Sequence, residues 1–311
     1  MPFVPGPASL ATLGEVSETG SNPPTSIGQT PKATAGGRWV GVGLVGFTLA
    51  GGMAIFVGGT PYFEFTAAND SPLYNAVLVA AFWLLARFLR RRPLLASYAT
   101  CSHALFIAAT AMLALVIGPF NWLVTADDGS VQQAVQDKLA QFLAIVPVIL
   151  VLTWAARRPW GWIYLQKGHL QRWVIFGLSS FAISAIAITG LALASGISWA
   201  ALLSAAPWIL VFAALNAVME ELWFRGIFLR PFSEGMGGRQ AVVVTAIIFA
   251  AAHIAATYTS SVGEQLLLVS LAAAIGFVAA WAMRWANSLW GAVLFHMGLD
   301  LLVVFGLLEA A

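Results

Sequence analysis

The sequence predicts an all-α, polytopic membrane protein with about nine transmembrane helices. Of its 311 residues, 60% are hydrophobic and only 9% are charged, which leaves too little charge to cover a water-soluble domain of this size. The apolar residues also gather in long runs, each close to the length that a helix needs to cross a lipid bilayer. Basic residues form no run outside the short segments that flank these apolar runs, so the composition excludes a nucleic-acid-binding protein.

Residues 1–37 differ from the rest of the chain. They are rich in Pro, Gly, Ser and Thr and contain no apolar run, so they cannot bury enough surface to fold. They also lack a basic start followed by an apolar core, which argues against a signal peptide. We expect three regions: a disordered tail over 1–37, N-terminal transmembrane helices over 38–198, and helices that carry the functional residues over 199–307.

Each long apolar run is expected to form one transmembrane helix. The expected spans are residues 39–59, 73–89, 94–118, 137–156, 172–195, 199–222, 241–258, 264–283 and 287–307. Proline inside a helix removes a backbone hydrogen bond, so we expect Pro147 to kink the fourth span and Pro207 to kink the sixth. The sixth span is expected to continue as helix through Arg225 toward Arg230.

The distribution of Lys and Arg predicts how the chain is oriented in the membrane. Cytoplasmic segments of membrane proteins carry an excess of these residues. With the N-terminus in the cytoplasm, all but one of the 15 basic residues fall on the cytoplasmic side, and the exception is Lys138. The expected topology is therefore a cytoplasmic N-terminus and an external C-terminus.

Few ionisable residues lie inside the expected spans, and these residues should carry the function. A charge in a spanning helix costs at least ~2.5 kcal/mol and usually has a task. Glu220 and Glu221 are adjacent in the sixth span, while His253, His296 and Asp300 lie in two later spans. At about 1.5 Å of rise per residue, these polar positions lie roughly 14–20 Å from the cytoplasmic ends of their helices. They can therefore converge on one site in the cytosolic half of the bilayer.

Spacing along the helices separates supporting residues from reactive ones. Glu221 and Arg225 are four residues apart, so they share a helix face and can form an ion pair. Glu220 is turned about 100° away from that pair and stays available as the reactive group. Two further pairs share a helix face in the same way, His296 with Asp300 and Phe249 with His253.

One carboxylate with two imidazoles suits two kinds of hydrolytic site. Glu220, His253 and His296 could hold a divalent metal ion such as Zn²⁺, with one position open for water. Alternatively, Glu220 acts as a general base toward water, and the histidines and Asp300 stabilise the developing charge. Both lead to hydrolysis, and a peptide bond is the expected substrate. A cysteine nucleophile has less support, because the single cysteine, Cys101, lies in the third span, where a buried structural thiol is the commoner case.

Three ordered motifs resemble those of a known family. They are Glu220-Glu221-x-x-x-Arg225, Phe249-x-x-x-His253 and His296-x-x-x-Asp300, with Ser288-Leu289-Trp290 leading into the third. In this order they look like the motifs of the CPBP family, which comprises the type II CAAX prenyl endopeptidases and the bacteriocin-processing or immunity proteins. The resemblance covers roughly residues 200–305, about a third of the chain, and includes no part of residues 1–198.

The resemblance implies an intramembrane metalloendopeptidase of a bacterial-type inner membrane, with its site open to the cytosol and a membrane-associated peptide or protein as substrate. By motif position, Glu220 would activate water, and His253 and His296 would ligate the metal or stabilise the oxyanion. Asp300 stands where the family most often has Asn. An ionised aspartate cannot donate a hydrogen bond, so metal ligation or orientation of His296 is its expected role. Support for the site is expected from Glu221, Arg225 and Phe249.

Two other functions stay open at the level of the sequence. A bacteriocin-immunity or peptide-binding protein would use the same polar cluster to hold a peptide without cleaving it. A proton- or ion-coupled transporter would use the carboxylates and histidines as a relay. The order of the motifs and the absence of an inverted repeat in the sequence favour hydrolysis over transport.

Overall fold

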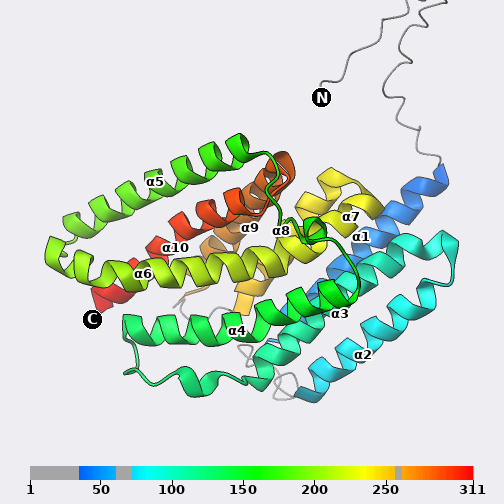
Figure 1. Cartoon of the computed structure of the whole chain (residues 1–311), viewed down its shortest axis with the longest axis horizontal. Coiled ribbons are helices and arrows are strands. Elements are labelled where there is room, and N and C mark those ends of the chain that lie inside the picture. The colour runs from blue at the N-terminus through cyan, green and yellow to red at the C-terminus, as the bar shows by residue number, and fades with distance from the viewer. Residues whose placement is uncertain (1–34, 61–71, 256–260, 311) are drawn as a thin grey trace, which may run out of the picture.

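The computed structural model describes residues 35–60, 72–255 and 261–310, so the expected disordered tail lies almost entirely outside the described residues. The long helices are α1 (Ala35–Phe56), α2 (Pro72–Leu89), α3 (Ala96–Ile117), α4 (Val131–Ala155), α5 (Leu170–Ala194), α6 (Trp199–Glu220), α7 (Ile227–Met236), α8 (Gly238–Ala252), α9 (Val262–Ala286) and α10 (Trp290–Ala310). Short helical turns are η1 (Pro93–Leu95), η2 (Asn121–Leu123), η3 (Trp160–Ile163), η4 (Glu221–Gly226) and η5 (His253–Ala255). These helices and their connections make up the described part of the chain (Figure 1).

The described helices confirm an all-α polytopic membrane protein. Within the described residues, six helical segments are long and apolar enough to cross a bilayer: Pro72–Leu89, Pro93–Ile117, Val131–Ala155, Leu170–Ala194, Trp199–Met236 and Val262–Ala286. Shorter apolar helices cover Gly41–Phe56, Gly238–Ala252 and Trp290–Leu302. Each of these segments overlaps one expected span. Large apolar side chains on α5 face outward, as expected for contact with lipid; they include Ile175, Leu178, Ile183 and Ile186.

The fourth helix begins earlier than the sequence predicts. It starts at Val131 rather than at residue 137, because the hydroxyl of Ser130 accepts a hydrogen bond from the backbone N–H of Gln133 and caps the helix. The first turns of α4 are rich in polar residues. They lie before the apolar run, yet they are part of the same helix. Pro147 and Pro207 both lie inside their helices, α4 and α6.

The prediction that the sixth span continues past residue 222 is confirmed. Helical structure runs from Trp199 to Met236, a length of 38 residues, through α6, η4 and α7. The middle segment, Glu221–Gly226, is π-helical and completely buried. π-Helical turns are rare and frequently occur at functional sites. α6 itself packs against α4 on one side and against α10 on the other, so it connects the N-terminal helices with the C-terminal ones (Figure 1).

The connection between α4 and α5 is joined to the turn between α9 and α10. The hydroxyl of Ser288 donates to the backbone oxygen of Gln166 at 2.8 Å. Gly168 has a φ of +54°, and a Cβ there would lie 2.4 Å from the backbone oxygen of Ala286. Only glycine allows this close approach without strain. These contacts hold the start of α10, the helix with the third motif, against the N-terminal part of the protein.

Candidate functional site

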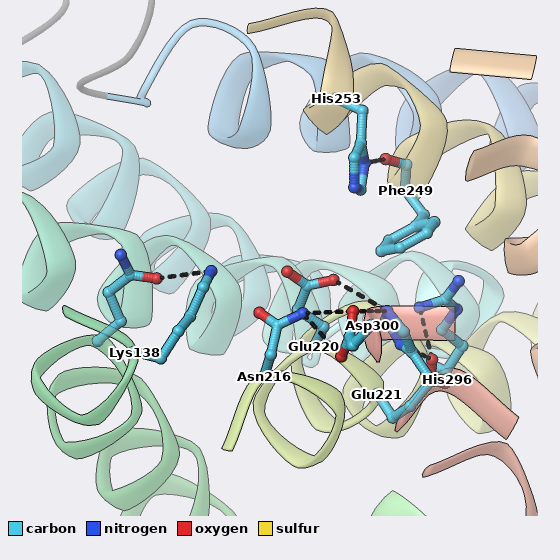
Figure 2. Close-up of polar contacts among 10 residues, drawn as sticks. Lys138, Asn216, Glu220, Glu221, Phe249, His253, His296 and Asp300 are labelled. Carbon is cyan, nitrogen blue, oxygen red and sulfur yellow. Dashed lines mark hydrogen bonds and ion pairs between the residues drawn. The ribbon is translucent and has the colours of Figure 1, made fainter. Parts of the chain in front are cut away.

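The structure brings all three sequence motifs to one place. Glu220 ends α6, Glu221 begins η4, His253 follows α8, and His296 and Asp300 lie on α10. Figure 2 shows Glu220, Glu221, His296 and Asp300 side by side, with the ring of His253 directed toward them from the opposite side. The expected convergence of these helices is therefore found in the fold.

Glu221 makes two buried contacts. Its Oε1 atom lies 3.0 Å from Nη1 of Arg225, and both side chains are fully buried, as the i,i+4 spacing predicts. The same oxygen lies 2.8 Å from Nδ1 of His296. An ionised carboxylate can only accept hydrogen bonds, so Nδ1 carries a proton and donates a hydrogen bond to Oε1 of Glu221. Glu221 thus fixes the ring orientation of His296 as well as pairing with Arg225.

The second nitrogen of His296 faces two other carboxylates. Nε2 lies 3.6 Å from Oε2 of Glu220 and 3.6 Å from Oδ1 of Asp300. Both distances are longer than a hydrogen bond and correspond to ion-pair contacts. Nε2 is therefore the atom at which the carboxylate of α6 and the carboxylate of α10 meet.

Asp300 is held by a residue that the sequence did not place in the site. Nδ2 of Asn216 donates to Oδ1 and to Oδ2 of Asp300, at 3.2 Å each, in a buried position. Asn216 lies four residues before Glu220 on α6, so the two share a helix face. That spacing was the one sign in the sequence that Asn216 could reach the site.

The ring of Phe249 contacts three of the polar side chains of the site. Its ring lies 4.5 Å from the ring of His253 and 5.9 Å from the ring of His296, edge to face in both cases. The guanidinium carbon of Arg225 lies 3.7 Å from the centre of the same ring. Gly276 on α9 leaves room for this packing, since a Cβ there would lie 3.1 Å from Nη2 of Arg225. The expected contact of Phe249 with His253 is confirmed, and Phe249 also contacts His296 and Arg225.

His253 is oriented by its own helix. Its Nδ1 atom lies 2.8 Å from the backbone oxygen of Phe249. A carbonyl oxygen can only accept, so Nδ1 carries the proton and Nε2 of the neutral ring is a free acceptor. Among the described residues, His253 forms no hydrogen bond or ion pair with Glu220, His296 or Asp300. It faces the acidic cluster without touching it (Figure 2).

The expected metal set of Glu220, His253 and His296 is not assembled in this arrangement. Within residues 35–60, 72–255 and 261–310, no three His, Cys, Asp or Glu side chains are placed to hold a metal ion. Zinc requires three protein ligands within about 2.0–2.2 Å of one point. The side chains as placed do not fit a metal ion, because His253 stands apart from the other two. Metal binding by this set stays a prediction.

Lys138, the exception to the basic-residue pattern, faces this site from α4. Its ammonium group donates to Oε1 of Gln141 at 3.2 Å and lies 5.8 Å from the ring centre of Phe212. Figure 2 shows the side chain extended toward Asn216 and Glu220. Its positive charge interacts electrostatically with Glu220 and Asp300. A helix outside the three motifs therefore contributes a cation to the site. Cys101 takes no part, since it is buried in α3 against the backbone oxygen of Pro231.

Residues 200–302 match a family model described as Type II CAAX prenyl endopeptidase Rce1-like. The matched range contains all three motifs, from the first residues of α6 to just beyond Asp300 on α10, and it agrees with the resemblance of the motifs to the CPBP family. Neither a curated protein nor a solved structure matches the chain. The helices before α6 lie outside the matched range.

Proposed function

We propose that this protein is an intramembrane endopeptidase that hydrolyses a peptide bond in a membrane-associated peptide or protein. The observation that carries the proposal is the arrangement around His296: Glu221 holds Nδ1, while Nε2 faces Glu220 and Asp300. The family match over residues 200–302 supports a membrane protease in general.

Glu220 is the proposed general base. Its side chain is 16% exposed, whereas the side chain of Glu221 is completely buried and already pairs with Arg225. Only Glu220 of the adjacent glutamates can therefore meet a water molecule. It takes a proton from that water as the oxygen attacks the peptide carbonyl, and it later gives this proton to the leaving amine.

The two histidines are proposed to have different roles: His296 donates a hydrogen bond, and His253 accepts one. In its doubly protonated form, His296 donates through Nε2 to the carbonyl oxygen as that oxygen becomes negative. His253 donates through Nδ1 to Phe249, so its Nε2 can accept a hydrogen bond from the attacking water. Asp300, held by Asn216, positions His296.

A divalent metal such as Zn²⁺ is kept as a separate prediction from the motif resemblance. When bound, it would polarise the carbonyl and lower the pKa of its water. Glu220, His253 and His296 would hold it, and His253 would have to move toward the other two, because the three side chains do not converge on one point as placed. The roles given above for these residues do not depend on a metal.

We also propose that the protein spans a cell membrane with its N-terminus in the cytoplasm. The arginines that follow α2 and those that follow α4 would then lie on the cytoplasmic side, together with α7. The motif resemblance implies that the site opens toward that side.

The proposal is tested with full-length protein in proteoliposomes and a set of membrane-anchored peptides, whose cleavage is followed by mass spectrometry. Glu220→Gln should lower the cleavage rate by roughly 10²–10⁴-fold while the melting temperature stays unchanged. Glu234→Gln is the matched control, because Glu234 is an exposed glutamate on α7 of the same continuous helix. It should cleave like the unmodified protein.

The main rival is an immunity-type protein that binds a peptide without cleaving it. A variant with Glu220→Gln, His253→Ala and His296→Ala together separates the two functions. Full protection of cells against a peptide toxin by this variant, with no cleavage by the unmodified protein, would favour the binding function and reject the protease.

A further inference from the structure

A basic cavity lies between the N-terminal helices, away from the candidate site. It has a volume of about 480 Å³ and is lined by Arg87 and Arg90 at the end of α2, Arg157 and Arg158 at the end of α4, and His103 on α3. A neighbouring cavity of about 260 Å³ shares Arg90, His103 and Arg158 with it. The shared residues make these cavities one basic region, which we call the arginine cavity.

No acidic side chain among the described residues neutralises the positive charge of the arginine cavity. All salt bridges among the described residues lie in the candidate site, and none includes these four arginines. Nε2 of His103 is buried and has no hydrogen-bond partner in the described part of the chain. Like charges held close together repel one another. The cavity therefore presents several unused hydrogen-bond donors and an excess of positive charge, which an anion would balance.

The arginines are also held in place. The guanidinium carbon of Arg87 lies 5.7 Å from the ring centre of Trp83, and that of Arg158 lies 5.5 Å from the ring centre of Trp162. Arg157 has a φ of +54°, a left-handed conformation that residues with a side chain rarely adopt. Guanidinium groups stacked on aromatic rings keep their N–H donors free for an anion. Their fork of donors matches the oxygens of a phosphate.

The remaining walls of the arginine cavity are apolar. They include Trp83, Phe106 and Leu152. Trp83 is itself 47% exposed, and other large apolar side chains of α2 and α4 point outward, with Phe88 exposed by 58% and Val151 by 57%. A free inorganic anion would not need such a surface. The acyl chains of a lipid would lie along it while the headgroup occupied the basic end.

We propose that the arginine cavity binds the phosphate of an anionic phospholipid, with the acyl chains lying against α2 and α4. The ligand is defined by three features on the protein: unpaired guanidinium groups, an adjoining apolar wall, and a place at the ends of two spanning helices. Basic pockets between membrane helices bind anionic headgroups in this way. This lipid site is independent of the proposed peptidase site, because the two share no lining residue.

The test measures lipid binding to the full-length protein by native mass spectrometry in detergent, with phosphatidylglycerol as the anionic probe and phosphatidylcholine as the zwitterionic one. The unmodified protein should retain phosphatidylglycerol and release phosphatidylcholine. Arg90→Gln and Arg158→Gln should each weaken phosphatidylglycerol binding roughly five-fold, which corresponds to about 1 kcal/mol for each arginine near the surface. Arg90→Lys keeps the charge and should weaken binding less.

Arg91→Gln provides the matched control. Arg91 follows Arg90 directly and is also exposed, but it does not line the arginine cavity. It should bind phosphatidylglycerol like the unmodified protein, and all variants should melt at the same temperature without lipid. If Arg91→Gln weakened phosphatidylglycerol binding as much as Arg90→Gln does, the lipid would be attracted by the positive surface in general and not by the arginine cavity. That result would overturn the proposal.

A second arm separates a lipid from a free phosphate. Inorganic phosphate at millimolar concentration should neither raise the melting temperature nor displace phosphatidylglycerol. If inorganic phosphate alone bound with the affinity of the lipid, the apolar wall would contribute nothing, and the assignment to a phospholipid would be wrong. Equal retention of phosphatidylcholine would have the same consequence.

Discussion

Oε1 of Glu221 lies 2.8 Å from Nδ1 of His296 and 3.0 Å from Nη1 of Arg225. One buried oxygen therefore joins the first motif to the third and also balances the charge of Arg225. The adjacent glutamate, Glu220, is left with its carboxylate toward Nε2 of the same imidazole. Adjacent residues of identical chemistry thus have different roles, because successive residues of a helix point in different directions.

The first prediction concerns the stability that depends on Glu221. Glu221→Gln should lower the free energy of unfolding by about 3–5 kcal/mol, because it leaves Arg225 as an uncompensated buried charge. The melting temperature in detergent measures this loss. Glu220→Gln serves as the comparison, since Glu220 is partly exposed and has no ion pair with Arg225. Equal melting temperatures of the two variants would show that Glu221 is not the structural member of the pair.

The second prediction concerns the hydrogen bonds between Asn216 and Asp300. Asn216→Asp should lower both stability and cleavage, because it places two carboxylates against each other. The exchange of both residues, Asn216→Asp with Asp300→Asn, restores one amide facing one carboxylate and should recover part of both losses. A double-mutant cycle should give an interaction energy of about 0.5–3 kcal/mol. Strictly additive effects would mean that the two side chains do not interact.

The third prediction tests the metal that the motif resemblance implies. If Glu220, His253 and His296 bind Zn²⁺, His253→Ala and His296→Ala should contain less metal than the unmodified protein. Chelation should then stop cleavage, and added zinc should restore it. Metal content is measured by elemental mass spectrometry on purified protein. Unchanged cleavage after chelation would assign the reaction to Glu220 acting without a metal, and it would remove the metal prediction.

The fourth prediction concerns topology. Because all but one of the 15 basic residues fall on one side of the expected spans, a reporter fused after residue 311 should be external, and one inserted between α4 and α5 should be cytoplasmic. Paired reporters that are active on only one side of the membrane measure this. A cytoplasmic C-terminus would show that the number of spans is wrong by one.

The fifth prediction concerns the close approach at Gly168. Gly168→Ala should destabilise the protein, because alanine in the left-handed region costs about 1–2 kcal/mol and its Cβ would also collide with the backbone oxygens of Ala286 and Asn287. Gly129→Ala separates the two causes, since Gly129 has a φ of +79° but no atom near the added Cβ. Gly168→Ala should melt at a clearly lower temperature than Gly129→Ala, and a similar loss in both would exclude the collision.

The parts that the sequence predicted correctly are the local ones. The length of each apolar run indicates a spanning helix, and the pairs Glu221–Arg225 and Phe249–His253 follow from a spacing of four residues in one helix. The helix α4 begins at Val131, six residues before the expected span, because the cap at Ser130 extends the helix into polar sequence. Hydropathy records where apolar residues are, and it does not detect a capped polar turn.

Contacts between helices could not be read from spacing. Glu221 is 75 residues from His296, and Asn216 is 84 residues from Asp300. Each contact depends on how α6 packs against α10. Lys138 illustrates the same limit, because its place in the sequence marked it only as an exception to the charge pattern. Its direction toward the site depends on the packing of α4 against α6.

The π-helical segment Glu221–Gly226 has a consequence for how this protein tolerates changes in length. A π-turn holds one residue more than the α-turn it replaces, so this segment contains an extra residue inside an otherwise α-helical run. Removal of one residue, such as Leu222, would let the chain return to regular α-helix. The buried pair of Glu221 and Arg225 would then be three residues apart instead of four, so its geometry would change although no charged residue had been lost. The geometry of this buried ion pair therefore depends on the number of residues in the π-helical segment as well as on their identity.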